Sequence, residues 1–363
     1  MLMRGGTSRG PFFLASDLPR DPIARDEVLL AVLGSPDRRQ IDGLGGAHPL
    51  TSKVGIVSRS NTPGVDLDFL FAQLQPDSDK VDLTPNCGNM LAAVLPFALE
   101  RGIIAIQDGV TSARILTCNT GMQCDVTVLT PNGRLQYGGA ARIDGVPGSA
   151  APVKIHFLET AGSVCSALLP TGRVLDLINF PAPQGGRLQV AATLIDNGMP
   201  MVLMRASDFG ITGDETVAAL NADQRLRAKL ESLRLVAGEL MGLGDVQAKS
   251  YPKMCLIAAP RKGGAIATRC FIPHVCHEAI GVLAAVTVAT ACVLEGSIAQ
   301  GLAVTVKALQ STVSVEHPSG EFSVELELDA GDTTKIARAA LLRTARPLMR
   351  GEVLIPAHVW RDE

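Results

Sequence analysis

The stretch TPNCGNM, residues 84–90, runs directly into the apolar segment LAAVLPFAL, residues 91–99, and the rest of the chain is interpreted around it. Turn-forming residues precede a run of good helix formers, so the sequence predicts a loop that leads into a helix over residues 91–99. Cys87 and Asn89 then lie at the helix start, where free N–H groups and the helix dipole favour a thiolate or a bound carboxylate. The alternative is a buried structural cysteine, because free cysteine is among the most buried residue types. The amide side chains that flank Cys87 favour the functional interpretation.

The chain has 363 residues, which is long enough for two domains, and its composition predicts a compact globular protein. Apolar residues make up 47% of the chain and charged residues 19%, and the net charge of −3 comes without a basic run, so we expect no nucleic-acid partner. The most apolar segment, residues 279–294, is too short to span a bilayer and is interpreted as a buried helix, so no membrane partner is expected.

The cysteine pattern indicates reduced thiols rather than a metal centre or a disulfide framework. No Cys-x-x-Cys pair occurs and no Cys/His spacing suits zinc, so the sequence predicts no metal site. The first residues contain no apolar signal segment, and we therefore expect a cytoplasmic protein. Cys118 and Cys124 flank a predicted turn, and a disulfide between them is the less favoured alternative.

The glycine-rich stretch MRGGTSRG, residues 3–10, offers N–H groups, hydroxyls and positive charge together. Arg4, Thr7, Ser8 and Arg9 therefore become candidates for binding a carboxylate or phosphate. The stretch is no P-loop, because the Gly-Lys-Ser/Thr signature is missing. The alternative is an ordinary glycine-rich hairpin turn.

A second glycine-rich loop, DGLGGAHPLTSK, covers residues 42–53 and leads into an apolar strand. Lys53 lies at the junction between loop and strand. A lysine that is partly enclosed at such a place is a candidate general base. The alternative is a solvated lysine at a strand end.

The order of predicted elements suggests two similar halves. We expect strands at residues 11–14, 54–58, 66–75, 113–118, 122–129, 134–137, 153–158, 188–194, 202–205, 255–259, 265–271, 303–315, 322–328 and 352–355, and helices at 26–33, 214–220 and 223–241. The segment FPAPQGG, residues 180–186, is the clearest linker, so the domains are predicted at residues 1–182 and 183–345. Each half holds strands, a polar loop and one buried helix, which predicts a site between the halves.

In the second half the polar loop is PHVCHEAIG, residues 273–281, which enters the long apolar helix. His274, Cys276 and His277 offer three interpretations. They could contact a substrate, serve as structural residues or bind a metal, although no third metal ligand is placed by the sequence.

Taken together, these motifs resemble the PrpF-like isomerases over the whole chain and in order. The segments that carry the resemblance are RGGTS (4–8), DGLGG (42–46), LTSK (50–53), TPNCGN (84–89), LLPTG (168–172), MGLGD (241–245), HVCH (274–277) and RPLMRGEV (346–353). The resemblance implies the α+β diaminopimelate-epimerase-like fold. That fold has two pseudo-duplicated domains, each a mostly antiparallel sheet wrapped around a central helix, with the active site in the cleft between them. It also implies that a C-terminal strand within residues 346–363 returns to the first domain.

Members of the family move a double bond in a small unsaturated polycarboxylate, and within the family the chain is most similar to enzymes that tautomerise 4-oxalomesaconate in gallate and protocatechuate breakdown. The resemblance implies a 1,3-proton shift without a cofactor, carried by Lys53 and Cys87, with the roles of acid and base left open. The substrate-binding residues that it implies are Arg4, Thr7, Ser8, Arg9, Ser52, Asn86, Gly88, Asn89, Met90, His274, His277 and Gly281.

One departure from related epimerases is informative. Epimerases of this fold carry a second cysteine at the start of the second helix, whereas this chain has EAIGVL at residues 278–283. We therefore expect one thiol and one amine rather than two thiols. Two alternatives stay open: an isomerase of aconitate or methylitaconate type, and a non-catalytic polycarboxylate-binding protein. A homodimer is an ordinary expectation for such a chain.

Overall fold

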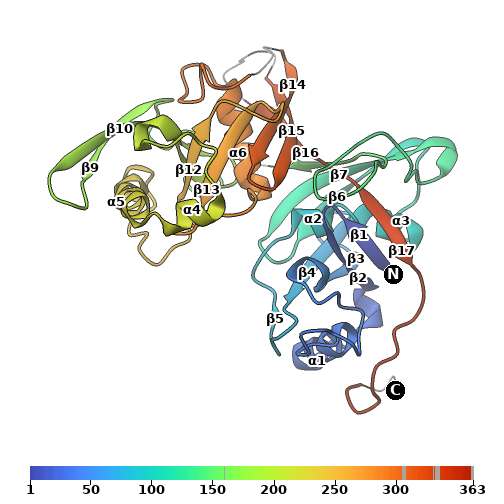
Figure 1. Cartoon of the computed structure of the whole chain (residues 1–363). Coiled ribbons are helices and arrows are strands. Elements are labelled where there is room, and N and C mark those ends of the chain that lie inside the picture. The colour runs from blue at the N-terminus through green and yellow to red at the C-terminus, as the bar shows by residue number, and fades with distance from the viewer. Residues whose placement is uncertain (159, 305–307, 330, 332–335, 361–363) are drawn as a thin grey trace. The chain divides into compact units, whose positions relative to one another are not determined.

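The computed structural model describes residues 1–158, 160–304, 308–329, 331 and 336–360. The chain forms two compact units. Unit 1 is Met1–Leu158 with Leu342–Glu363, and unit 2 is Glu159–Leu341. In Figure 1, unit 1 runs from blue to green and ends with a red strand, and unit 2 runs from green to red. The sequence placed the division at residue 182, whereas the compact units divide after Leu158.

Unit 1 is a mostly antiparallel sheet. Its strands are β1 (Leu2–Gly5), β2 (Ser8–Leu14), β3 (Lys53–Arg59), β4 (Leu67–Leu74), β5 (Val81–Asp82), β6 (Gly109–Thr117), β7 (Met122–Thr130), β8 (Val153–Phe157) and β17 (Ala345–Met349). Along the succession β1–β2–β3–β4–β6–β7–β8, the pairs β2–β3 and β4–β6 are parallel and all others are antiparallel. The last strand, β17, pairs antiparallel with β1, so the sheet of unit 1 is completed from the far end of the chain.

Unit 2 repeats this succession. Its strands are β9 (Asp176–Pro181), β10 (Arg187–Asp196), β11 (Pro200–Arg205), β12 (Lys253–Ala258), β13 (Ile266–Phe271), β14 (Gln310–His317), β15 (Gly320–Leu328) and β16 (Ile336–Arg343). Along β10–β11–β12–β13–β14–β15–β16, the pairs β11–β12 and β13–β14 are parallel and the others antiparallel. β9 pairs antiparallel with β10, as β17 does with β1. The predicted pseudo-duplication is therefore confirmed strand by strand.

Each unit has one central helix buried on every side. The helices are α1 (Pro22–Leu33), α2 (Gly88–Leu91), α3 (Val94–Glu100), α4 (Val217–Ala222), α5 (Gln224–Leu240) and α6 (Val282–Val293), with 3-10 turns at Ala15–Asp17, Pro49–Thr51, Pro131–Gly133 and Ala206–Phe209. All of residues 94–99 in α3 and 284–292 in α6 are buried, which is typical of a helix enclosed by its own unit. Within the described part of the chain, no helix is both long and apolar enough to cross a membrane.

The helix predicted over residues 91–99 is split. α2 ends at Leu91 and α3 begins at Val94. Pro96 explains the break, because proline has no N–H to donate to the carbonyl of Ala92 four residues earlier. Pro96 therefore occupies the first turn of a new helix. The first helix also differs from its prediction. α1 begins at Pro22 instead of residue 26, because Asp21 caps it by accepting a hydrogen bond from Ala24 N at 2.8 Å.

Several further predictions of secondary structure were wrong. Residues 134–137 and 352–355, which are described, lie in no strand, and β16 was not predicted. The expected linker at residues 180–186 is the end and turn of the hairpin β9–β10, where Ala182 N bonds to Gly186 O at 3.1 Å. Cys118 and Cys124 form no disulfide, and each is a free thiol.

Candidate active site

Cys87 lies at the start of the central helix of unit 1. It is the N-cap residue of α2, is half-buried, and its carbonyl oxygen accepts a hydrogen bond from Leu91 N at 2.9 Å. Gly88 is the first helical residue, and the side chain of Met90 is fully buried. The predicted arrangement of a turn that presents Cys87 at a helix start is therefore confirmed, although the helix itself has a single turn.

Two asparagines fix the loop around Cys87. Asn86 Nδ2 donates to the hydroxyls of Thr117 and Thr120, each at 3.0 Å. Asn89 Nδ2 donates to Thr7 Oγ1 at 3.0 Å, which ties the helix start to the turn between β1 and β2. These bonds explain why amides flank the cysteine.

Three buried polar atoms in this region have no hydrogen-bond partner among the described residues. They are Asn86 Oδ1, Asn89 Oδ1 and Ser8 Oγ. Ser8 is only 1% exposed. Buried polar atoms in folded proteins are nearly always satisfied, so each of these orphaned atoms can take a hydrogen bond from, or give one to, a bound polar molecule.

Lys53 is the first residue of β3 and is 7% exposed. Its Nζ donates to Gln73 Oε1 on the neighbouring strand, where Gln73 is its direct cross-strand partner, and it lies 5.0 Å from the centre of the Phe71 ring. Within the described chain, Lys53 has no carboxylate partner. The amine is thus held by a neutral amide and an aromatic ring, which suits a group that must exchange a proton.

Gln73 is itself held rigidly. Its Nε2 donates to the backbone carbonyls of Pro49 at 3.1 Å, Ser52 at 3.2 Å and Leu74 at 2.8 Å. These three bonds turn its Oε1 toward Lys53. Ser52, a predicted substrate-binding residue, is fully buried, and its hydroxyl donates to Gln40 Oε1 at 2.8 Å and His48 O at 2.9 Å.

Lys53 lies on the face of the unit 1 sheet that carries α2 and α3. Gly55, two residues further along β3, meets the ring of Phe12, which contacts Phe97 of α3. A Cβ added at Gly10 would overlap Lys53 O and lie 3.2 Å from Met90 Cε, and one added at Gly5 would overlap Asn89 O. The glycines of β1 and β2 are therefore needed so that both segments can approach the same hairpin. Residues 3–10 form the hairpin that was the predicted alternative, with Gly6 and Thr7 between β1 and β2.

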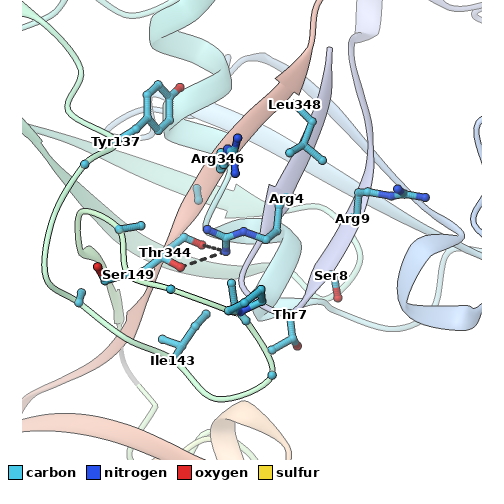
Figure 2. A pocket seen from close by; sticks show the side chains of 18 residues that line it. Arg4, Thr7, Ser8, Arg9, Tyr137, Ile143, Ser149, Thr344, Arg346 and Leu348 are labelled. Carbon is cyan, nitrogen blue, oxygen red and sulfur yellow. Dashed lines mark hydrogen bonds between the residues drawn. The ribbon is translucent and has the colours of Figure 1, made fainter.

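Arg4 and Arg9 point the other way. They are direct cross-strand partners in β1 and β2, and they alternate with Met3, Gly5 and Gly10, which face the helix. Arg4, Thr7, Ser8 and Arg9 all line a cavity of about 520 Å³ in unit 1 (Figure 2). The side chains of Arg4 and Arg9 are therefore not brought to the face that carries Lys53.

Unit 2 holds the remaining predicted residues. His274 Nδ1 lies 3.1 Å from Glu231 Oε2, and His277 Nδ1 lies 3.1 Å from Ala279 O. Gly281 is the N-cap residue of α6, without a side-chain cap. The described residues contain no cluster of three or more potential metal ligands.

A model of the PrpF protein family matches residues 1–356 of the chain. The chain belongs to the PrpF family. The (4E)-oxalomesaconate Delta-isomerase of Novosphingobium sp. (strain KA1) is 54% identical over 98% of this chain and 96% of that protein. The 4-oxalomesaconate tautomerase of Pseudomonas putida is 51% identical over 99% of this chain and 96% of that protein. Among solved structures, a methylitaconate-delta-isomerase aligns over 99% of this chain and 95% of that chain, with 32% identity and a TM-score of 0.85. The expected α+β fold is therefore confirmed.

Two residues of this PrpF chain were missed by the sequence analysis. One is Gln73, whose role depends on strand register. The other is Lys253, the first residue of β12, which occupies in unit 2 the topological position of Lys53 in unit 1. A Cβ at Gly281 would lie 3.7 Å from Lys253 Nζ, so this lysine lies at the start of α6. Aligning the two halves by their strand succession would have found it.

Proposed function

We propose that the chain is an isomerase that catalyses a 1,3-proton shift in 4-oxalomesaconate, as the names of the two relatives above suggest for those proteins. The observation that supports the proposal is that unit 1 holds, on one face of its sheet, a buried lysine amine with a neutral amide partner and a half-buried cysteine at a helix start. Binding alone would be better served by arginine, whose planar fork matches carboxylates.

In the proposed reaction, one of Lys53 and Cys87 removes a proton from a carbon that is acidified by conjugation with a carbonyl group. The electron pair of the broken C–H bond enters the conjugated system and gives a delocalised enolate. The other group delivers a proton to the far end of that system, and the double bond moves. Positioned proton transfer of this kind contributes about 10²–10⁴-fold in rate.

The orphaned buried atoms support a polar ligand at the same place. Ser8 Oγ donates to a carboxylate oxygen of the substrate, while Asn86 Oδ1 and Asn89 Oδ1 accept from a hydroxyl or protonated group. The tie from Asn89 to Thr7 keeps these groups in one arrangement. No cofactor enters this proposal.

The deciding experiment follows 4-oxalomesaconate by ultraviolet absorption and proton NMR in deuterated water. Turnover with deuterium entering a defined carbon is expected for the wild-type chain. Lys53→Met and Cys87→Ser are each expected to lose most activity. Lys80→Met and Cys118→Ser, which change exposed residues of the same types in unit 1, are the matched controls. Near-wild-type turnover in both active-site variants, or turnover without exchange, contradicts the proposal.

A second candidate is favoured by the solved structure of a methylitaconate-delta-isomerase that the chain resembles. In that case the chain would move the double bond of an aconitate- or methylitaconate-like acid. Assaying these acids beside 4-oxalomesaconate separates the two reactions. A protein that only binds polycarboxylates would leave every spectrum unchanged.

We also propose that the chain works in aromatic-acid breakdown in the cytoplasm, and that it forms a homodimer. Growth of a deletion strain on gallate or protocatechuate tests the first statement, and light scattering of the purified protein tests the last. Normal growth of the deletion strain or a monomeric mass would contradict them.

A further inference from the structure

Three neighbouring strands of unit 1 carry a row of arginines on the face turned away from the helix. Arg346 on β17 is the direct cross-strand partner of Arg4 on β1, and Arg4 is the partner of Arg9 on β2. Directly opposed residues of an antiparallel pair lie on the same face, where like charges destabilise the sheet. A negatively charged group outside these strands would therefore stabilise the row of arginines.

The cavity that these arginines line is bordered on one side by the loop of residues 138–150 (Figure 2). In the figure the side chains of Arg4 and Arg346 come from neighbouring strands, and Thr344 lies against Arg4. Arg9 extends in another direction, toward Gly46. All three arginines line the cavity, but the charge that acts on Arg4 is that of Arg346.

Arg4 is oriented by the protein but not neutralised by it. Its NH1 donates to Gly6 O at 2.9 Å and to the carbonyl and hydroxyl oxygens of Thr344, both at 3.0 Å. Neither its remaining donors nor those of Arg346 have an acceptor among the described residues. Burial, followed by repulsion from Arg346, lowers the pKa of Arg4.

The nearby acid Glu100 is already engaged. It accepts from Tyr137 OH at 3.1 Å and pairs with Arg350, while the structure gives no carboxylate to either arginine of the pair among the residues that it describes. Placing a half-buried guanidinium group without a carboxylate partner beside a second guanidinium group costs free energy unless an anion binds between them. Two arginine forks match the oxygens of a carboxylate or phosphate.

We propose that Arg4 and Arg346 form a binding site for a small oxyanion of two or more negative charges, on the face of the β17–β1–β2 sheet opposite to Lys53. Arg346 and the free nitrogens of Arg4 donate to its oxygens, and Thr344 holds Arg4 in place. The ligand is a polycarboxylate or a phosphate, and its binding does not depend on the proposed reaction.

The test measures anion binding by calorimetry at constant ionic strength, with inorganic phosphate and with tricarballylate as the probes. The variants are Arg346→Gln, which removes the charge, and Arg346→Lys, which keeps the charge but loses the fork. Arg38→Gln is the matched control, because Arg38 is 85% exposed and lies in unit 1 outside the cavity. Arg346 is exposed, so its variants are expected to fold.

We expect at least about ten-fold weaker binding of one or both probes in Arg346→Gln, an intermediate loss in Arg346→Lys and no change in Arg38→Gln. An effect on phosphate alone identifies a phosphate ligand, and an effect on tricarballylate alone identifies a polycarboxylate. Absence of binding to the wild-type chain, or equal binding by Arg346→Gln, overturns the proposal. The experiment measures binding and not turnover, so its result does not depend on whether the chain catalyses the proposed reaction.

Discussion

The two units share a strand succession but differ at the start of their central helices. In unit 1, Lys53 begins β3 and Cys87 caps α2, whereas in unit 2 Lys253 begins β12 and Gly281 caps α6. The lysine is present twice and the thiol once. Burial lowers the pKa of Lys253, with a smaller opposing effect from Cys270. The difference teaches that a duplicated scaffold can keep an amine in both copies while the thiol at the helix start is present in one copy alone.

The largest expected effect separates the two lysines. Lys53→Met is expected to lower turnover by about 10²–10⁴-fold, because it removes a proton-transfer group. Lys253→Met is expected to stay within about ten-fold of the wild type, since the helix start beside it carries Gly281 and no thiol. Steady-state kinetics on the same substrate measures both. Equal losses of turnover in the two variants would show that the two units do not differ in this respect and that both lysines transfer protons.

The second effect concerns the glycines that let backbones approach. Gly10→Ala would overlap Lys53 O and is expected to lower the free energy of unfolding by about 1–3 kcal/mol. Gly281→Ala meets its nearest atom at 3.7 Å and is expected to change that free energy by less than about 0.5 kcal/mol. Chemical denaturation followed by circular dichroism tests both. A stable Gly10→Ala chain with full activity would show that the hairpin need not be so close to Lys53.

A smaller effect is expected for the amide that holds Lys53. Gln73→Leu removes a single hydrogen bond to the amine and is expected to lower turnover about ten-fold. Gln75→Leu, at an exposed position of the same segment, is the control. Thermal melts of both variants separate lost orientation from lost stability. Unchanged turnover in Gln73→Leu would mean that Lys53 is positioned by its strand alone.

The smallest effect on stability is expected when the missing thiol is supplied. Gly281 has ordinary backbone angles (φ −66°, ψ 151°) and room for a side chain, so Gly281→Cys is expected to change the free energy of unfolding by less than about 0.5 kcal/mol. Its thiol would lie beside Lys253 and should be alkylated faster than that of the exposed Cys118, because a neighbouring ammonium group favours the thiolate.

The double variant Gly281→Cys with Lys253→Met is the control for this last prediction. If the introduced thiol reacts at the same rate with and without Lys253, the two helix starts are not electrostatically similar. That result would mean that the two units resemble each other in backbone topology but not in the electrostatics of their helix starts.

Much of the candidate site could be read from local sequence. Cys87 at a helix start and Lys53 at a strand start each follow from turn residues next to an apolar run. Gln73 could not be found in this way, because its contact with Lys53 depends on the register between β3 and β4. The outward direction of Arg4 could not be found either, since strand alternation had to be known on both sides of a two-residue turn.

The errors in the predicted secondary structure have similar causes. Residues 180–186 contain the prolines and glycines of a linker, but those residues equally suit the turn of a long hairpin, and only the pairing of β9 with β10 decides. The split of the helix at Ala92 follows from Pro96, because a proline cannot donate to the carbonyl group four residues upstream.

The pairing of β17 with β1 has a consequence for synthesis. Unit 2 lies between the two parts of unit 1 in the sequence, so the ribosome makes all of unit 2 before the strand that closes unit 1. Domains commonly fold in the order in which they are translated. Here the unit that is begun first must be finished last, and until then the edge of β1 that receives β17 is left open to chaperones or to strands of other nascent chains.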